Sequence, residues 1–203
     1  EELKISEESL DNKYENSTEY DADGNLIATL SGGTKRKSIS LSEMSEYLPK
    51  AYVAIEDERF YSHSGIDVIR TGRATVTYFL HGGKSSFGGS TITQQVIKNI
   101  TQDKEKTAFA GALRKVKEIS KAIQVEHYLS KDQILELYLN LIFTAGNDIN
   151  GVELGSIYYF DKSAKDLSIA ECAYMAGINH SPNSYKPFAN YDGDETKKNE
   201  MNE

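Results

Sequence analysis

Cysteine is nearly absent from this sequence, which also has few prolines and no tryptophan. Among 203 residues there are one cysteine, three prolines and no tryptophan. A single cysteine excludes an internal disulfide framework and any cysteine-rich zinc cluster. Because Cys172 lies in an apolar stretch beside alanines, we expect it to be a small core residue.

Positive charge is also in short supply. The chain has 23 Lys and Arg residues against 31 Asp and Glu residues, a net charge of −8. This balance argues against a general nucleic-acid binder, because such proteins carry a basic excess. The four histidines, at positions 63, 81, 127 and 180, show no metal-ligand spacing, so no metal site is predicted.

Long hydrophobic runs are missing as well. No stretch approaches the ~18 consecutive apolar residues of a membrane span. The chain opens with Glu1-Glu2-Leu3-Lys4 rather than with a signal peptide, and we interpret both ends as cut from a longer protein. A hydrophobic content of 38% with 10% aromatic residues argues against disorder, and the length suits a single domain.

The hydrophobic pattern predicts a mainly α fold with a small β-hairpin near the start. Residues 17–40 carry the hairpin signal, because a turn-forming stretch separates short polar and apolar runs. Pro49 and Ser130 mark the starts of two helices. Further helices are expected over residues 66–80, 90–100, 109–128, 151–160 and 167–177. The helix after Ser130 has one apolar face, formed by Ile134, Leu135, Tyr138, Leu139 and Ile142. Residues 81–89 contain four glycines and are expected to form a mobile loop.

The first candidate site lies at the end of an apolar helix. There, Glu56, Asp57 and Glu58 are followed by Arg59. A carboxylate at such a boundary is partly desolvated, which raises its pKa toward a value suited to proton transfer. The alternative is a solvated acidic helix end that pairs with Arg59, and composition alone favours this alternative.

The second candidate site joins a glycine-hinged loop to a helix, over residues 88–99. The N-terminus of a helix attracts anions. Gln94 and Gln95 each lie about one helical turn before Lys98, so two amides and one ammonium share a face suited to a sugar or a phosphate. The alternative is a polar, solvent-facing surface beside a mobile loop.

The third candidate site is basic. Arg114 and Glu118 lie four residues apart, and the default interpretation is a surface ion pair worth only ~0.3–0.5 kcal/mol. From Lys98 to Lys131, however, eight basic residues face four acidic ones. This local excess of four positive charges, inside an acidic chain, is where an anionic partner would bind.

Taken in order, these segments resemble the five motifs of the family 51 glycosyltransferases. These are the peptidoglycan glycosyltransferase domains of class A penicillin-binding proteins and of monofunctional transglycosylases. The residues that match the motifs are Glu56, Asp57, Phe60, His63 and Gly65, then Ser90, Thr91, Gln94 and Gln95 with Lys98, then Arg114, Lys115 and Glu118, then Glu136, Tyr138 and Asn140, and finally Glu171, Pro182 and Tyr185. The resemblance covers about residues 17–188.

The resemblance implies a lysozyme-like, two-lobed helical domain with a small membrane-facing jaw. It implies polymerisation of lipid II into glycan strands, with inversion at the donor anomeric carbon and release of undecaprenyl diphosphate, at the extracytoplasmic face of the bacterial plasma membrane. The expected boundaries are a polar lead-in over residues 1–16, after a membrane anchor absent from this chain, then the glycosyltransferase domain over 17–190 and a truncated helix or linker over 191–203. Whether a transpeptidase domain follows stays open.

The same resemblance implies roles for individual residues. Glu56 would take the proton from the acceptor 4-hydroxyl, although some descriptions of the family call this residue the proton donor, and Glu118 would orient the cations or the leaving group. The residues expected to bind substrate or diphosphate are Lys98, Arg114, Lys115, Gln94, Gln95, Ser90, Thr91, Asp57, His63 and Asn140. We expect a phosphoglycolipid inhibitor such as moenomycin to place its phosphate against the three cations.

The expected partners are lipid II, the growing glycan strand, the membrane surface and other cell-wall synthesis proteins, and nucleic acid is not among them. No cofactor is required with certainty, and Mg²⁺ or another divalent cation at the diphosphate is left open. Whether Lys104 or Lys106 supplies the family's extra basic residue is also open.

The sequence departs from the family in three places and leaves two rival functions. Residues 101–113 form a longer segment than in many relatives, and residues 154–156 replace a more alanine-rich stretch, which we interpret as packing only. Phe143 stands where the family usually has tyrosine, so a hydroxyl contact to ligand is in doubt. Phe79, Leu80 and Phe87 fit a jaw near the lipid or an ordinary core equally well. One rival is a hydrolase or lytic transglycosylase, which needs no basic site for a diphosphate. The other is a non-catalytic glycan- or lipid-binding module, against which the presence of both glutamates argues.

Overall fold

The structure is a computed structural model that describes residues 17–20, 26–30, 35–80, 89–101, 108–145 and 149–180. The α-helices in these ranges are α2 (Tyr47–Glu56), α3 (Val68–Leu80), α4 (Ile92–Thr101), α5 (Ala108–Tyr128), α6 (Lys131–Leu141), α7 (Val152–Phe160) and α8 (Ile169–His180). Short 3-10 turns are η1 (Leu41–Glu43), η2 (Phe60–Ser62) and η3 (Ala164–Asp166). The mainly α class is therefore confirmed, and it agrees with the expected lysozyme-like domain.

Two small sheets accompany the helices. Strands β1 (Ser17–Tyr20) and β2 (Leu26–Leu30) pair antiparallel, which confirms the predicted hairpin, although its turn lies outside the described residues. The second sheet has the order β3-β5-β4 and is built from β3 (Lys35–Arg36), β4 (Phe143–Ala145) and β5 (Ile149–Asn150). The sequence pattern did not predict this sheet, because strands of two or three residues are too short to show alternation.

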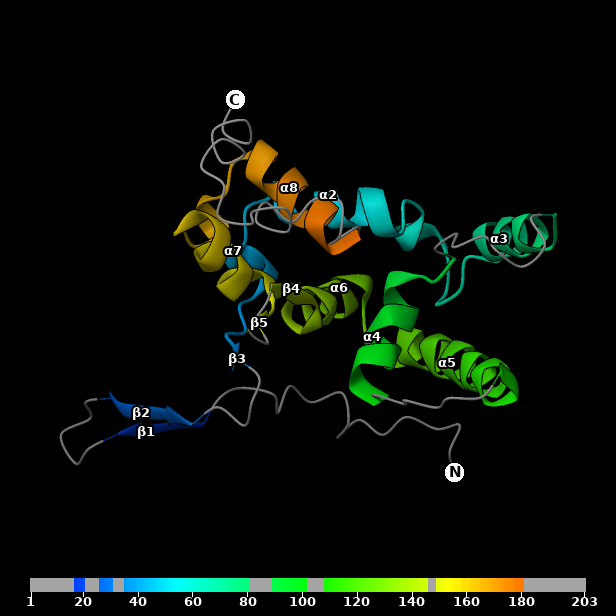
Figure 1. The fold of residues 1–203 in the computed structure, drawn as a ribbon, viewed down its shortest axis with the longest axis horizontal. Coiled ribbons are helices and arrows are strands. Elements are labelled where there is room, and N and C mark those ends of the chain that lie inside the picture. Colours follow the sequence, from blue (N-terminus) through cyan, green and yellow to red (C-terminus); the bar gives the residue numbers. More distant parts are fainter. Residues whose placement is uncertain are drawn as a thin grey trace, which may run out of the picture.

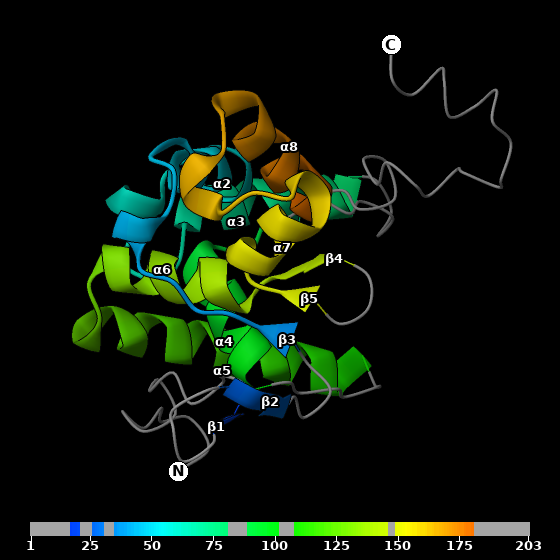
Figure 2. The same cartoon turned by 90° about the vertical axis from the view of Figure 1, so that its left-hand side faces the viewer.

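The helices are arranged in tiers around one core. Helix α2 packs against α8, and α4 packs against both α5 and α6. Figure 2 shows α2 and α8 at the top, α6 in the middle and α5 at the bottom, while Figure 1 shows α3 projecting away from α7. The largest fully buried side chains include Tyr52, Tyr138, Phe60, Leu48, Ile92 and Leu135. This packing brings the C-terminal ends of α2 and α8 to the side of α4.

Helix starts follow the capping residues in the sequence. The Ser130 side chain accepts a hydrogen bond from the Gln133 amide at the start of α6, as predicted. At the start of α4, the Thr91 hydroxyl accepts from the Gln94 amide at 3.2 Å and the Gln94 side chain accepts from the Thr91 amide at 2.9 Å. This reciprocal capping box explains why α4 begins at Ile92. The predicted apolar face of α6 is buried throughout.

Three predicted helix boundaries were wrong by a few residues. Helix α3 begins at Val68 rather than at residue 66, because the Asp67 carboxylate accepts from the Arg70 amide at 2.8 Å and so caps the helix. Helix α8 begins at Ile169 rather than at residue 167, because Ser168 and Glu171 form another reciprocal cap. It also continues to His180, three residues beyond the expected end, and this extension brings His180 to Glu56.

Helix α3 exposes much of its apolar surface. The exposed fractions of Ile69, Val76 and Leu80 are 55%, 58% and 78%, so Leu80 is not an ordinary core residue. The predicted mobile loop lies outside the described residues except for Gly89, and Phe87 falls within it. No helix in the described ranges has the length and apolar character needed to cross a membrane.

Candidate active site

The carboxylate of Glu56 lies where three helices meet. Glu56 is the last residue of α2 and is only 8% exposed. Its Oε2 accepts a hydrogen bond from the Gln95 amide nitrogen of α4 at 3.0 Å, and its Oε1 lies 3.2 Å from Nδ1 of His180 at the end of α8. The prediction of a partly desolvated carboxylate is therefore confirmed for Glu56, whose side chain is held by donors on both oxygens.

The alternative of a solvated acidic cluster paired with Arg59 is wrong for Glu56. Glu58 is exposed, as that alternative expects, but Arg59 donates instead to the buried carboxylate of Asp67, with Nε 2.9 Å from Oδ2. Arg70 of α3 donates to the backbone carbonyl of Glu56. These contacts attach the α2 terminus to the start of α3.

Asp57 connects the end of α2 to the start of α4. Its side chain is fully buried, and Oδ2 accepts from the Ile92 amide at 3.0 Å and lies 2.9 Å from Nε2 of His63. The His63 side chain is itself only 8% exposed. These bonds connect the end of α2, and so Glu56, to the start of α4. The expected contact of Asp57 and His63 with substrate stays a prediction.

Thr91, Gln94 and Asn140 are also buried and hydrogen-bonded to protein. Thr91 and Gln94 are fully buried in the α4 cap, and the Thr91 hydroxyl donates to the Gly65 carbonyl at 2.7 Å. The Asn140 side chain is 4% exposed and makes two hydrogen bonds to the Ile39 backbone, at 3.1 and 2.9 Å. Each of these three side chains is buried and bonded to protein, and its expected contact with ligand stays a prediction.

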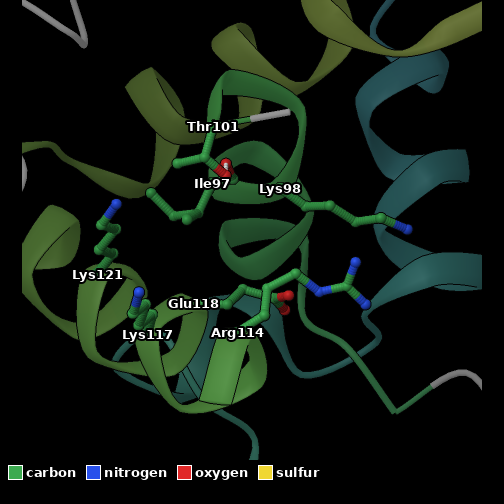
Figure 3. A pocket seen from close by; sticks show the side chains of 7 residues that line it. All are labelled: Ile97, Lys98, Thr101, Arg114, Lys117, Glu118 and Lys121. Carbon is green, nitrogen blue, oxygen red and sulfur yellow. Dashed lines mark hydrogen bonds between the residues drawn. The ribbon is translucent and has the colours of Figure 1, made fainter. Parts of the chain in front are cut away.

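The cationic residues surround a pocket between α4 and α5. The pocket is shallow and partly open to solvent, and its lining residues are Ile97, Lys98, Thr101, Arg114, Lys117, Glu118 and Lys121. Figure 3 shows Lys98 and Arg114 extending to the same side of the pocket, with Lys117 and Lys121 on the opposite side. Four cations against one carboxylate give the pocket a strongly positive field, which suits a phosphate or diphosphate.

Glu118 and Lys115 form a close ion pair at this pocket. The Lys115 ammonium lies 2.5 Å from Glu118 Oε1 and donates to the Ser90 hydroxyl at 2.8 Å. Glu118 is 8% exposed, so its charge is held in place rather than solvated. Through Lys115, the carboxylate on α5 is connected to the segment that precedes α4, so Ser90, Lys115 and Glu118 lie together. Their contact with substrate stays a prediction.

A buried tyrosine supports the opposite side of Gln95. The Tyr138 hydroxyl lies 3.5 Å from Gln95 Oε1 and accepts from the Asn179 amide at 3.2 Å. Burial raises the pKa of Tyr138, and the neighbouring charge of Glu56 raises it further. Tyr138 therefore keeps its proton and acts as a hydrogen-bond donor to Gln95, which orients the Gln95 amide toward Glu56.

Comparison with known proteins identifies the family. The sequence model of the family described as Transglycosylase matches residues 23–203, most of the chain. The chain belongs to this transglycosylase family. The resemblance inferred from the five motifs is thereby confirmed.

Several relatives share the transglycosylase domain. The chain is 44% identical over 175 residues to penicillin-binding protein 1A of Clostridium acetobutylicum, and the aligned residues make up 84% of the chain and 21% of the relative. It is 42% identical over 172 residues to penicillin-binding protein 1F of Bacillus subtilis, covering 85% and 23%. It is 38% identical over 195 residues to penicillin-binding protein 1A/1B of Bacillus subtilis, covering 96% and 21%. The chain thus spans about a fifth of the length of these relatives.

Three residues of the transglycosylase site were not among the predicted ligands. Lys117 and Lys121 line the pocket, and their spacing of four residues on α5 places them on one face, a signal the sequence contained. His180 carried no such signal, because it lies 124 residues from Glu56 in the chain. In the described part of the chain, no cluster of three or more His, Cys, Asp or Glu residues is arranged to hold a metal ion.

Proposed function

We propose that this transglycosylase domain is a peptidoglycan glycosyltransferase that polymerises lipid II into glycan strands, with inversion at the donor anomeric carbon and release of undecaprenyl diphosphate. The observation that supports it most is a pairing of two features. One is the buried carboxylate of Glu56, to which Gln95 of α4 donates. The other is the cationic pocket between α4 and α5. Glycosyl transfer from a lipid diphosphate needs both.

The Glu56 carboxylate would accept the proton that the acceptor hydroxyl releases in this reaction. As the acceptor 4-hydroxyl attacks the donor anomeric carbon, the new carbon–oxygen bond forms and the bond to the diphosphate oxygen breaks. The hydroxyl proton passes to Glu56, and the diphosphate leaves with the electron pair. Hydrogen bonds from Gln95 and His180 hold the carboxylate in one orientation, which general base catalysis requires.

The cations of the pocket would stabilise the diphosphate leaving group. Negative charge develops on the diphosphate as its bond breaks, and preorganised positive charge is often the largest catalytic contribution. Lys98 and Arg114 extend to the same side of the pocket, and a guanidinium can make two parallel contacts to a phosphate. Glu118 holds Lys115 in place beside Ser90. A divalent cation at the diphosphate would supplement this charge.

The substrate determines where the domain works. Lipid II and the growing strand are anchored by their lipid, so we place the reaction at the outer surface of the bacterial plasma membrane, among other cell-wall synthesis proteins. The exposed apolar side chains of α3 are suited to that surface.

Product analysis tests the proposal. Purified protein is incubated with labelled lipid II, and separately with preformed glycan strands. A transferase converts lipid II into ladders of increasing length and leaves the strands intact. A hydrolase or lytic enzyme shortens the strands, and a binding module changes neither. We expect ladders, lost in the Glu56→Gln variant and strongly reduced in Glu118→Gln, and shortened strands without ladders would refute the proposal.

A further inference from the structure

The cationic pocket between α4 and α5 has two ends. Figure 3 shows Lys98 and Arg114 extending to one side, which we call the catalytic end. Lys117 and Lys121 extend to the opposite side, which we call the outer end. Lys98 lies about one helical turn after Gln95, the residue that donates to the proposed general base, so the catalytic end is the one near that carboxylate. The outer end has no part in the proposed diphosphate site.

The helices that form the outer end do not neutralise its charge. Within their described ranges, α4 has no Asp or Glu, and α5 has two, Glu118 and Glu126. Glu118 pairs with Lys115 at 2.5 Å. Glu126 pairs with Lys131 at 2.7 Å. In the described part of the chain, Lys121 forms no ion pair. Both carboxylates of α5 are thus engaged by other cations, and the positive field of the outer end remains to attract an anion.

The two lysines of the outer end are spaced to contact one anion. Lys117 and Lys121 lie four residues apart on α5, so they share a face with roughly 6 Å of rise between them. Both are partly buried. Ile97, beside them in the pocket, is 1% exposed, and the Thr101 hydroxyl donates to its carbonyl at 2.9 Å. Recognition at the outer end therefore depends on two ammonium groups, which act as point charges toward a carboxylate or a phosphate.

The proposed substrate carries a second anion at a matching separation. The sugar of lipid II that bears the diphosphate also carries a short peptide with free carboxylates. Arg114 and Lys121 are seven residues apart, which corresponds to about 10 Å along α5. An extended peptide spans about 3.5 Å per residue, so three residues cover that distance. A substrate with its diphosphate at the catalytic end can therefore place a peptide carboxylate at the outer end.

We propose that Lys117 and Lys121 form a second anion-binding subsite, which recognises a carboxylate of the substrate's peptide. The inference rests on the proposed function and adds a specificity contact that the transfer itself does not need. Neither lysine is among the residues that match the family motifs. Because the contact is the same in the bound substrate and in the transition state, it strengthens binding without changing the chemical step. Loss of the two lysines should therefore raise KM and leave kcat unchanged.

Removal of charge at the outer end tests the subsite. The variant is Lys117→Gln/Lys121→Gln, in which each glutamine keeps part of the side chain and loses the charge. The matched control is Lys50→Gln/Lys165→Gln, which removes two charges at exposed positions on α2 and η3. Each protein is assayed with labelled lipid II and with the same lipid after its peptide carboxylates are converted to amides. Urea unfolding verifies that the variants are folded, as expected for partly or fully exposed positions.

The expected result depends on the substrate. With lipid II, Lys117→Gln/Lys121→Gln raises KM about tenfold and keeps kcat within about twofold of wild type. With the amidated lipid, wild type and this variant share the raised KM, because the carboxylate is absent in both cases. The control variant behaves as wild type with both substrates. An equal rise in KM on the two substrates, no rise on either, or a fall in kcat would overturn the inference.

Inorganic diphosphate distinguishes the outer end from the diphosphate site. Added as a competitor, it should inhibit wild type and Lys117→Gln/Lys121→Gln to the same degree, because both keep Lys98 and Arg114. Inhibition about tenfold weaker in the variant would mean that the two lysines bind the diphosphate rather than a carboxylate, and would overturn the inference.

Binding without turnover separates this inference from the proposed function. Dissociation constants of lipid II and of its amidated form are measured for Glu56→Gln, with and without the two lysine substitutions. A loss of affinity of about tenfold that is confined to lipid II supports the subsite. It does so even if wild type forms no glycan ladders, a result that refutes the proposed function alone. Equal affinities, together with ladders from wild type, overturn the subsite and leave the proposed function standing.

Discussion

Removal of the Asp57 carboxylate tests whether this residue holds the site together or binds substrate. Asp57 is fully buried and accepts from the Ile92 amide at 3.0 Å, and it lies 2.9 Å from His63 Nε2. Asp57→Ala leaves a buried amide and a buried imidazole without their acceptor. Each lost partner costs about 1–3 kcal/mol, and removing one member of a buried pair costs about 3–5 kcal/mol, so we expect a loss of about 4 kcal/mol.

The assay is thermal and urea unfolding of the whole chain. A loss of about 4 kcal/mol in a chain of this length lowers the melting temperature by roughly 12 °C. Asp57→Asn keeps an oxygen in the place of Oδ2 and should lose no more than about half as much free energy. Asp166→Ala, at an exposed position in η3, is the matched control and should change the free energy of unfolding by less than about 0.5 kcal/mol.

The result that would refute this reasoning is specific. If Asp57→Ala unfolds at the same midpoint as Asp166→Ala while losing affinity for lipid II, Asp57 is a ligand residue and its contacts to α4 carry no free energy. If it loses stability as predicted, the position of Gln95 relative to Glu56 depends on this buried connection.

Two further predictions concern stability. A methyl group on Gly65, whose φ is +87°, would lie 2.7 Å from the Ala122 backbone. Gly65→Ala should therefore lower the free energy of unfolding by about 3 kcal/mol in urea melts. Gly72→Ala, in open space on α3, should raise the free energy of unfolding slightly, and equal effects of the two substitutions would contradict the close approach at Gly65. The hydrogen bond from Lys162 lowers the pKa of Glu171 from 4.5 to about 2. The contribution of this contact to the free energy of unfolding is therefore complete above about pH 4.5 and is lost as pH falls toward 2. Acid titration should therefore destabilise wild type more than Glu171→Gln between those values, and parallel curves would count against the pair.

Much of the fold was predictable because local signals specify it. Ser130 and the periodic face of α6 determine where that helix begins and which side it buries, and both are contained in about a dozen neighbouring residues. The order of five motifs was enough to predict the family. The same motifs did not predict how deeply each matched side chain is buried, since burial depends on distant parts of the chain.

Asn140 and His180 make contacts that the sequence did not predict. Asn140 bonds to Ile39, 101 residues earlier, through a pairing that neither segment encodes by itself. His180 reaches Glu56 only because α8 continues beyond Gly177 and packs along α2. Contacts of this kind arise from the packing of whole helices, so the residues that surround the carboxylate had to come from the structure.

The most direct test of the account is polymerisation of labelled lipid II by wild type and by Glu56→Gln, measured at matched concentrations of folded protein. Glutamine preserves the size of the side chain but cannot take up the proton, and a positioned general base contributes about 100-fold or more. The account predicts glycan ladders from wild type, no ladders from Glu56→Gln, and equal unfolding midpoints and lipid II binding for both. Polymerisation by Glu56→Gln at the wild-type rate would contradict it.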